Sequence, residues 1–357
     1  MLEKREFYIN GQWVSPVRTN DFEVIDPSTE ESCAVISLGA KEDTDAAVAA
    51  ARNAFESWSQ TSKEERMALL EKLYAIYKTR SGEMAEAIST EMGAPMALAK
   101  TAQWGAGAGH IKNLMRALKS FEFEQPLGDH APNNHILYEP VGVCGLITPW
   151  NWPMNQVALK VIAAMAAGCT MVLKPSEVSP LSSLLFAEMI DEAGFPAGVF
   201  NLVNGDGVGV GSELSGHPDV DMVSFTGSTR AGVAISKNAA DTVKRVSLEL
   251  GGKGANIVFA DADEKAVVRG VRHCFNNTGQ SCNAPTRMLV ERSAYDQAVA
   301  TAADVAAKTS VDLASIEGRH IGPVVSGLQH KNIAERHVQS WPDRLKVAAL
   351  TEPHPAP

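Results

Sequence analysis

One cysteine of this sequence lies in surroundings that suit chemistry better than packing. Cys282 stands in FNNTGQSCNAPTRM (275–288), among small, polar and turn-forming residues, with no other cysteine within seven positions. A structural cysteine usually occupies an apolar run, because its thiol behaves as a small hydrophobe. A thiol in a loop or at the start of a helix is accessible, and backbone dipoles can tune its ionisation. The context favours a reactive thiol, and the alternative is a partly buried cysteine at a turn.

Four further polar segments come directly after short apolar runs. They are PWNWP (149–153), KPSE (174–177), TGSTRAG (226–232) and ELGGK (249–253). In a doubly wound α/β domain, ligands bind at the carboxyl ends of the strands. The spacing therefore predicts that these segments share one ligand site.

The elements that must position these segments alternate between strands and helices from Val141 onward. Short apolar runs, which suit buried parallel strands, occur at 143–149, 169–175, 199–204 and 221–226. Helical patterns separate them, at 157–168, 180–194 and 211–217. A second α/β unit is predicted from strands at 244–253, 255–263 and 286–290 with a helix at 263–275. The fold class is α/β with a doubly wound parallel sheet.

The residues before Val141 predict mostly helices, with a hairpin at each end. FYINGQWV carries the Asn10-Gly11 signal of a tight β-hairpin. Helices are predicted at 43–59, at 62–80 and at about 95–119, and the second begins with a Ser62/Glu65 capping box. Residues 121–139 alternate around a Pro/Gly/Asn turn and predict a protruding hairpin that could form an interface.

Composition narrows the class of protein. The chain has 357 residues, enough for two domains, and its net charge of -10 argues against nucleic acid or an anionic membrane as a partner. No run reaches the roughly 18 apolar residues of a membrane span, and the N-terminus lacks the apolar core of a secretory signal. The five cysteines form no C-x-x-C pair, so we expect reduced thiols, a cytoplasmic protein and no bound metal.

Taken in order, these segments resemble those of the NAD(P)-dependent aldehyde dehydrogenase superfamily. The resemblance runs from about residue 7 to about residue 333 and includes ELGGK and the Gly-Gln-x-Cys context of Cys282. It implies a Rossmann-like cofactor domain, a second α/β catalytic domain and an oligomerisation hairpin, and a homodimer or homotetramer that oxidises an aldehyde with NAD. The implied boundaries are 1–120 and 140–248 for the cofactor domain, 121–139 for the hairpin, 249–340 for the catalytic domain and 341–357 for an irregular tail.

The resemblance gives three residues catalytic roles. Cys282 would add to the aldehyde as a thiolate, forming a thiohemiacetal and, once hydride has left, a thioester that water hydrolyses. Glu249 would be the general base. Asn151 would donate to the oxyanion together with the backbone N–H of Cys282. On the residues alone, Glu249 could equally be a paired carboxylate at a strand end, and Asn151 could be a turn-capping residue.

The resemblance also implies where NAD lies. The segment at 226–232 opens a helix whose N-terminal amides suit a pyrophosphate, and Lys174 with Glu177 resembles the pair that holds the adenosine ribose. A carboxylate there accepts hydroxyl hydrogen bonds and repels a 2′-phosphate, which favours NAD over NADP. The expected cofactor-binding residues are Ile147, Thr148, Pro149, Trp150, Lys174, Ser176, Glu177, Gly207, Phe225, Thr226, Gly227, Ser228, Gly232, Leu250 and Gly251.

The resemblance ends after Ser340. The remaining WPDRLKVAALTEPHPAP has no helix or strand pattern, and the family's later Glu-x-Phe-Gly-Pro segment has no counterpart. We therefore expect a C-terminally truncated member with an incomplete catalytic domain. Two alternatives to aldehyde oxidation follow: a chain that binds dinucleotide with weak or no turnover, and a thiol esterase that needs no cofactor.

Overall fold

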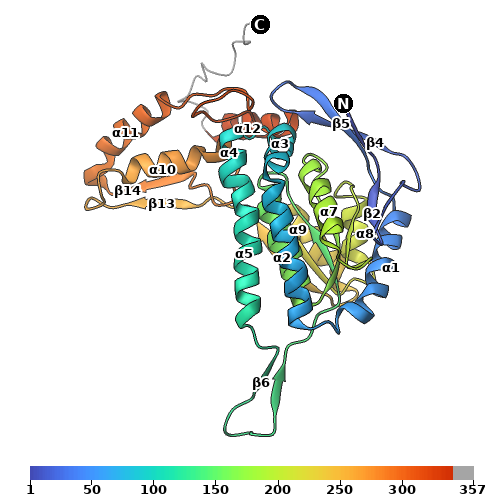
Figure 1. Ribbon diagram of the computed structural model, residues 1–357. Coiled ribbons are helices and arrows are strands. Elements are labelled where there is room, and N and C mark those ends of the chain that lie inside the picture. Colours follow the sequence, from blue (N-terminus) through green and yellow to red (C-terminus); the bar gives the residue numbers. More distant parts are fainter. Residues whose placement is uncertain (341–357) are drawn as a thin grey trace.

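The computed structural model describes residues 1–340, and of 336–340 only the course of the helix (Figure 1). Its centre is a seven-stranded sheet with the strand order β12-β11-β8-β9-β10-β2-β3. The five strands from β8 to β12 are parallel, and β2 and β3 extend the sheet antiparallel at one edge. Their bounds are Phe7–Ile9 (β2), Gln12–Val14 (β3), Val143–Ile147 (β8), Thr170–Lys174 (β9), Phe200–Leu202 (β10), Met222–Gly227 (β11) and Arg245–Leu250 (β12). The predicted parallel sheet is confirmed, but the assignment of the strand at 244–253 to the second α/β unit is wrong, because β12 pairs with β11 and extends this sheet.

Helices cover both faces of this sheet, so the domain is doubly wound. Alternate residues of a strand point to opposite faces: in β8, Cys144 and Leu146 join one core cluster, while Val143 and Ile147 join the other. The first cluster lies under α2, α5, α6 and α7, and the second under α1, α8 and α9. The helices bounding the sheet are α1 (Lys41–Trp58), α2 (Lys63–Thr79), α5 (Trp104–Ser120), α6 (Pro153–Ala167), α7 (Leu181–Ala193), α8 (Val210–Gly216) and α9 (Thr229–Ala240).

The helical layer before the sheet contains one helix that the sequence did not predict. The capping box is present, because the Ser62 hydroxyl accepts from the Glu65 N–H and the Glu65 carboxylate accepts from the Ser62 N–H. The unpredicted helix is α3 (Ser81–Met92), which follows α2 directly. It ends at Gly93, whose backbone is in the left-handed region. The predicted third helix then consists of α4 (Met96–Leu98), a π-helical turn (Ala99–Gln103) and α5.

The N-terminal hairpin is confirmed, and it lies beside a small sheet that was not predicted. Asn10 (φ 53°) and Gly11 (φ 74°) form the turn between β2 and β3, as the Asn-Gly signal requires. The small sheet consists of β1 (Leu2–Lys4), β4 (Asp21–Asp26) and β5 (Glu31–Ser37), with β5 in the middle.

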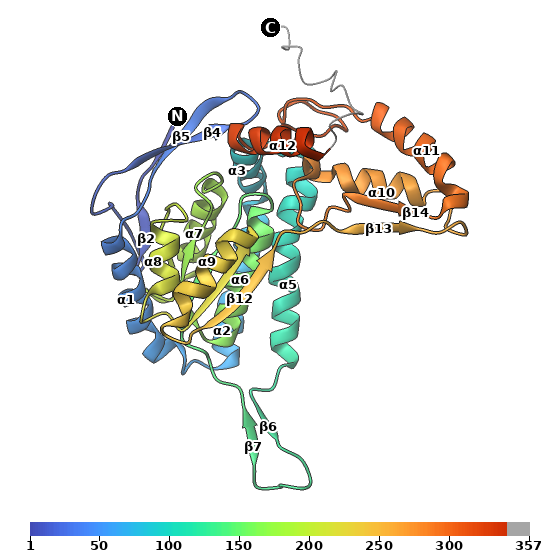
Figure 2. The same ribbon diagram turned by 180° about the vertical axis from the view of Figure 1, so that it is seen from behind.

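Two parts project from the main body (Figures 1 and 2). The predicted hairpin at 121–139 is present as β6 (Glu124–Pro126) and β7 (His135–Leu137). On another side, a second α/β unit pairs β13 with β14 in parallel. Its elements are β13 (Ala255–Val258), α10 (Ala266–Phe275), a 3₁₀ turn (Asn276–Gly279), β14 (Arg287–Val290), a second 3₁₀ turn (Arg292–Ala294) and α11 (Tyr295–Ala307), whereas α12 (Gly327–Ser340) lies beside α3 on the main body. The predicted tail, 341–357, lies outside the described residues.

No helix within residues 1–340 is both long and apolar enough to cross a membrane. The domain boundaries remain predictions.

Candidate active site

The register of the parallel sheet brings the predicted segments to one edge. Ile147 at the end of β8 pairs with Lys174 at the end of β9 and with Phe225 of β11. Continuing across the sheet, β11 pairs with β12 through Thr226 with Glu249 and Gly227 with Leu250. Backbone hydrogen bonds extend this order beyond the strands, from the Thr148 N–H to the Lys174 carbonyl (3.2 Å) and from the Gly251 N–H to the Gly227 carbonyl (3.2 Å).

The segment after β9 places a lysine and a carboxylate together. Lys174 Nζ lies 2.9 Å from Glu177 Oε2, and the side chains are 5% and 28% exposed. Between them, the Ser176 hydroxyl accepts from the Val178 N–H (3.3 Å), which tightens the turn. The buried ammonium is thus neutralised by a carboxylate that still reaches solvent.

The segment after β11 opens α9 as expected. The Ser228 hydroxyl accepts from the Ala231 N–H (3.2 Å) and caps the helix, whose first two residues are exposed. A side chain at Gly232 would lie 2.8 Å from Leu250, so glycine lets α9 approach β12. Gly207 is exposed in the loop after β10, with no atom within 4 Å of the place where a side chain would begin. Pro149 and Trp150 are partly buried in the loop after β8.

Cys282 is exposed, whereas the other four cysteines are buried or half-buried. It follows the 3₁₀ turn at the end of α10, in a turn where the Ala284 N–H donates to the Ser281 carbonyl (3.2 Å). The indole N–H of Trp152 donates to the hydroxyl of Ser281 (2.6 Å). The residue after Asn151 therefore contacts the residue before Cys282, although the two lie far apart in sequence.

Two hydrogen-bond donors near this contact have no partner within residues 1–340. The Asn151 side-chain oxygen accepts from the Trp152 N–H (3.1 Å), so the amide of Asn151 is the group left to donate. Among the described residues, neither this amide nor the backbone N–H of Cys282 makes a hydrogen bond. Unpaired donors of this kind can receive a developing negative charge.

Glu249 is exposed in β12 and lies within electrostatic reach of a lysine that the sequence analysis did not select. Lys160 of α6 is only 7% exposed and donates to the Ser224 hydroxyl (2.8 Å). Burial lowers the pKa of Lys160 to about 8, while the Glu249 charge acts in the opposite direction. One turn earlier on α6, Gln156 accepts from the hydroxyl of Thr226 (3.0 Å), the partner of Glu249 in the sheet. The sequence signal that could have identified Lys160 is its position as a single charged residue within the apolar run VALKVIAAM.

A doubly wound parallel sheet with lysine, carboxylate and glycine residues at its carboxyl edge defines the class of nucleotide-binding α/β proteins. The sequence model of the Aldehyde dehydrogenase family matches residues 13–346. The chain therefore belongs to the aldehyde dehydrogenase family, a family of enzymes.

Individual relatives agree with this assignment. The chain is 52% identical, over 94% of its length and 70% of the relative's, to a 3-succinoylsemialdehyde-pyridine dehydrogenase from a Pseudomonas species. It is similar to the crystal structure of an aldehyde dehydrogenase from Bartonella henselae (TM-score 0.92, 60% identity, 94% of this chain and 70% of that one). It is also similar to a Pseudomonas syringae aldehyde dehydrogenase C mutant in complex with NAD+ and octanal (TM-score 0.90, 45% identity, 93% and 68%).

Proposed function

We propose that this chain oxidises an aldehyde to a carboxylic acid with NAD, and that Cys282 is the nucleophile. One observation carries the proposal: the exposed thiol lies in a loop that contacts the loop of Asn151, and each loop holds an N–H donor without a partner in the described part of the chain. A thiol attacking a carbonyl needs access for the substrate and donors for the oxygen. Both are present together.

The first chemical step uses Cys282 and these two donors. The sulfur reacts as a thiolate, its proton having passed to Glu249 and on to solvent. It forms a bond to the carbonyl carbon, and the π electrons move to the oxygen, giving a tetrahedral thiohemiacetal. The Asn151 amide and the backbone N–H of Cys282 would stabilise that oxygen, and a donor of this type lowers the barrier by about 3 to 4 kcal/mol. Bound NAD supplies the acceptor for the hydride that the tetrahedral carbon expels.

Glu249 would complete the reaction as general base. The thioester on Cys282 is cleaved when water adds to its carbonyl carbon, and the carboxylate of Glu249 takes the proton of that water. The carbon–sulfur bond then breaks, which releases the acid and restores the thiol. Glu249 is exposed and no side chain stands at Gly251 or Gly252, so the carboxylate has room to move.

The residues at the sheet edge fit NAD. The exposed start of α9 offers backbone amides to a pyrophosphate, and the Lys174–Glu177 pair offers an ammonium and a carboxylate to ribose hydroxyls. The carboxylate would repel the 2′-phosphate of NADP. The open space at Gly207 suits close approach of the adenine. The NAD+ complex of the similar P. syringae enzyme supports the same cofactor.

The substrate proposal stays at the level of an aldehyde. Two relatives carry names that point to quite different aldehydes, a pyridine semialdehyde and octanal. The protruding hairpin at 121–139 exposes Leu127, Ile136 and Leu137, which supports its proposed role in a homodimer or homotetramer.

The test compares wild type with Cys282→Ala and, as a control, Cys274→Ala, the same change at a half-buried thiol. With NAD and a panel of aldehydes, we expect Cys282→Ala to lose NADH formation by about 1,000-fold or more and to keep its affinity for NADH. Activity remaining in Cys282→Ala would refute the nucleophile. Wild type that binds NADH without turnover would instead support the dinucleotide-binding alternative, and hydrolysis of an activated ester without NAD would support the esterase.

A further inference from the structure

Two side-chain amides join the loop of Asn151 to the loop of Cys282. Gln103 Nε2 donates to the Asn151 carbonyl (3.1 Å) and to Asn277 Oδ1 (3.2 Å). In turn, Asn277 Nδ2 donates to the same Asn151 carbonyl (2.9 Å) and to the carbonyl of Gln280 (3.1 Å). Three segments far apart in sequence therefore meet at one carbonyl oxygen, next to the residues proposed to act on the substrate.

These amides are removed from water. Gln103 is fully buried, and Asn277 and Gln280 are 4% and 5% exposed. A buried donor or acceptor that loses its partner keeps the full cost of desolvation. The amides therefore hold one arrangement of the two loops strongly, and a shift of either loop would leave several buried polar groups unpaired.

The backbone at this point adopts a conformation that needs support. Asn277 (φ 54°) and Thr278 (φ 59°) are consecutive non-glycine residues in the left-handed region, an arrangement that persists only when the surroundings fix it. On the far side, the Thr278 hydroxyl donates to the Gly322 carbonyl (2.9 Å), and Gln280 Oε1 accepts from the Val325 N–H (2.9 Å). The segment that leads to Cys282 is thus held from both sides.

Gln103 reaches this position from an irregular turn. It is the last residue of the π-helical turn Ala99–Gln103, which precedes α5. Such turns inside helices occur frequently at functional sites. Within residues 1–340 its own Oε1 is buried and has no partner, so packing alone does not account for an amide here: the polar group is explained by the hydrogen bonds that its Nε2 donates to Asn151 and Asn277.

We propose that Gln103 and Asn277 are positioning residues, which set the distance between the donor of Asn151 and the sulfur of Cys282. The proposal rests on the function proposed above, because it assumes that those two groups act on one carbonyl. Neither residue touches the substrate. They act by fixing the two loops that do.

The first test measures backbone amide exchange with mass spectrometry on the full chain. Gln103→Met removes the donor and keeps an apolar chain of similar length, and Asn277→Gly removes the side chain while easing the left-handed backbone. Gln297→Met, on the exposed surface of α11, is the control. We expect Gln103→Met to speed exchange about tenfold or more in both 148–154 and 276–284, although residue 103 lies in neither segment. Unchanged exchange in these segments would overturn the proposal.

The second test separates the two proposals through kinetics. We expect Gln103→Met and Asn277→Gly to lower kcat about 100-fold, as small displacements of reacting groups do, with the KM for NAD and the melting temperature close to the control. Wild-type kcat in both variants would overturn the positioning role. If wild type itself oxidised no aldehyde, the proposed function would fail, and the exchange experiment would still decide whether the two residues hold the loops together.

Discussion

The central strands of the large sheet and the two-stranded sheet of β13 and β14 are buried to very different degrees. Every residue of β8 and β9 in the large sheet is buried, whereas in β13 and β14 only Val258 is buried and the other residues are exposed or half-buried. Figure 2 shows the cause: helices lie on both faces of the large sheet, while α10 and α11 lie on one side of the small one. On the open face, Ile257, Phe259 and Leu289 are 60%, 62% and 52% exposed.

This difference indicates where the free energy of folding is concentrated. Burying a large apolar side chain completely contributes about 1.5–3 kcal/mol, and the large sheet has many fully buried apolar side chains. The small sheet buries apolar side chains on one face only. The Cys282 loop connects α10 to β14 of the small sheet, and hydrogen bonds of Gln103 and Asn277 attach it to the Asn151 loop after β8 of the large sheet. The precision of the site therefore depends on polar contacts at the junction, while the stability depends on the large core.

The largest expected change in the free energy of unfolding comes from truncating a buried side chain of the large sheet, with the same truncation in the small sheet as the comparison. Phe200 of β10 is 1% exposed and packs near the ring of Tyr8, so Phe200→Ala should lower the free energy of unfolding by about 3–5 kcal/mol. Leu289→Ala, on the open face, should change it by less than about 0.5 kcal/mol. Urea unfolding followed by circular dichroism measures both, and equal losses would contradict the comparison.

A buried carboxylate in the large core gives the next effect. Glu91 of α3 is fully buried and accepts from the Leu181 and Ser182 N–H groups at the start of α7. Burial raises the pKa of Glu91 to about 7, since it opposes ionisation more than these donors assist it. A carboxyl group whose pKa is raised on folding stabilises the fold most below its unfolded pKa, near 4.5, and that contribution is lost as the pH rises towards 7.

Glu91→Gln removes this titration and serves as the reference. The stability of wild type relative to Glu91→Gln should fall by about 3 kcal/mol between pH 4.5 and pH 7, at 1.36 kcal/mol per pKa unit. Urea unfolding of both proteins across this range measures the difference. A flat difference would show that Glu91 does not change its pKa on folding.

The comparison also explains what the sequence predicted well. The central strands of the large sheet are short, largely apolar runs, so β8 to β11 and the helices between them were predicted close to their bounds. β4 and β5 mix polar and apolar residues, DFEVID and ESCAVIS, and were missed. The segment of α3, SGEMAEAISTEM, begins directly after another helix and has no proline or glycine pair to separate them.

The same reasoning applies to the candidate site. Cys282 was selected from its own local context, and Asn151 from the resemblance of its segment, PWNWP, to that of the family. Gln103 and Asn277 could not be predicted, because their roles depend on contacts between residues that are 48 to 174 positions apart. Side chains that position other groups carry little local signal, since only the fold places them together.

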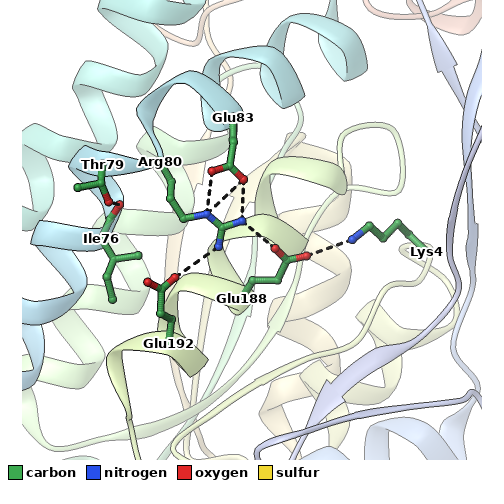
Figure 3. Close-up of polar contacts among 7 residues, drawn as sticks. All are labelled: Lys4, Ile76, Thr79, Arg80, Glu83, Glu188 and Glu192. Atoms are coloured by element: carbon green, nitrogen blue, oxygen red, sulfur yellow. Dashed lines mark hydrogen bonds and ion pairs between the residues drawn. The ribbon is translucent and has the colours of Figure 1, made fainter.

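A smaller effect is expected where charges, rather than apolar contacts, hold the surface of the large core. Arg80 contacts the carboxylates of Glu83 (2.7 Å), Glu188 (3.0 Å) and Glu192 (3.7 Å), and Glu188 also contacts Lys4 of β1 (3.1 Å) (Figure 3). The Arg80 side chain is 22% exposed. Arg80→Met should therefore lower the free energy of unfolding by about 1 kcal/mol, and by less at high salt.

The matched control is an exposed pair on the same domain. Arg18 lies 2.7 Å from Glu42, with side chains 72% and 49% exposed. Arg18→Met should have no measurable effect on urea unfolding, because solvent screens such a pair. Equal effects of the two substitutions would mean that the network around Arg80 adds nothing beyond a single surface contact.

The smallest effect on stability, and the sharpest test of the comparison, is expected on the open face of the small sheet. Ile257 and Leu289 are opposite each other in β13 and β14 and line, with Phe259, a hollow of about 360 Å³. If water reaches this face, Ile257→Lys should change the free energy of unfolding by less than about 0.5 kcal/mol, and it should reduce light scattering by concentrated protein because exposed apolar patches promote association. If Ile257→Lys lowered the free energy of unfolding by 2 kcal/mol or more, this face would be covered in solution. Both sheets would then be buried, and the comparison above would be wrong.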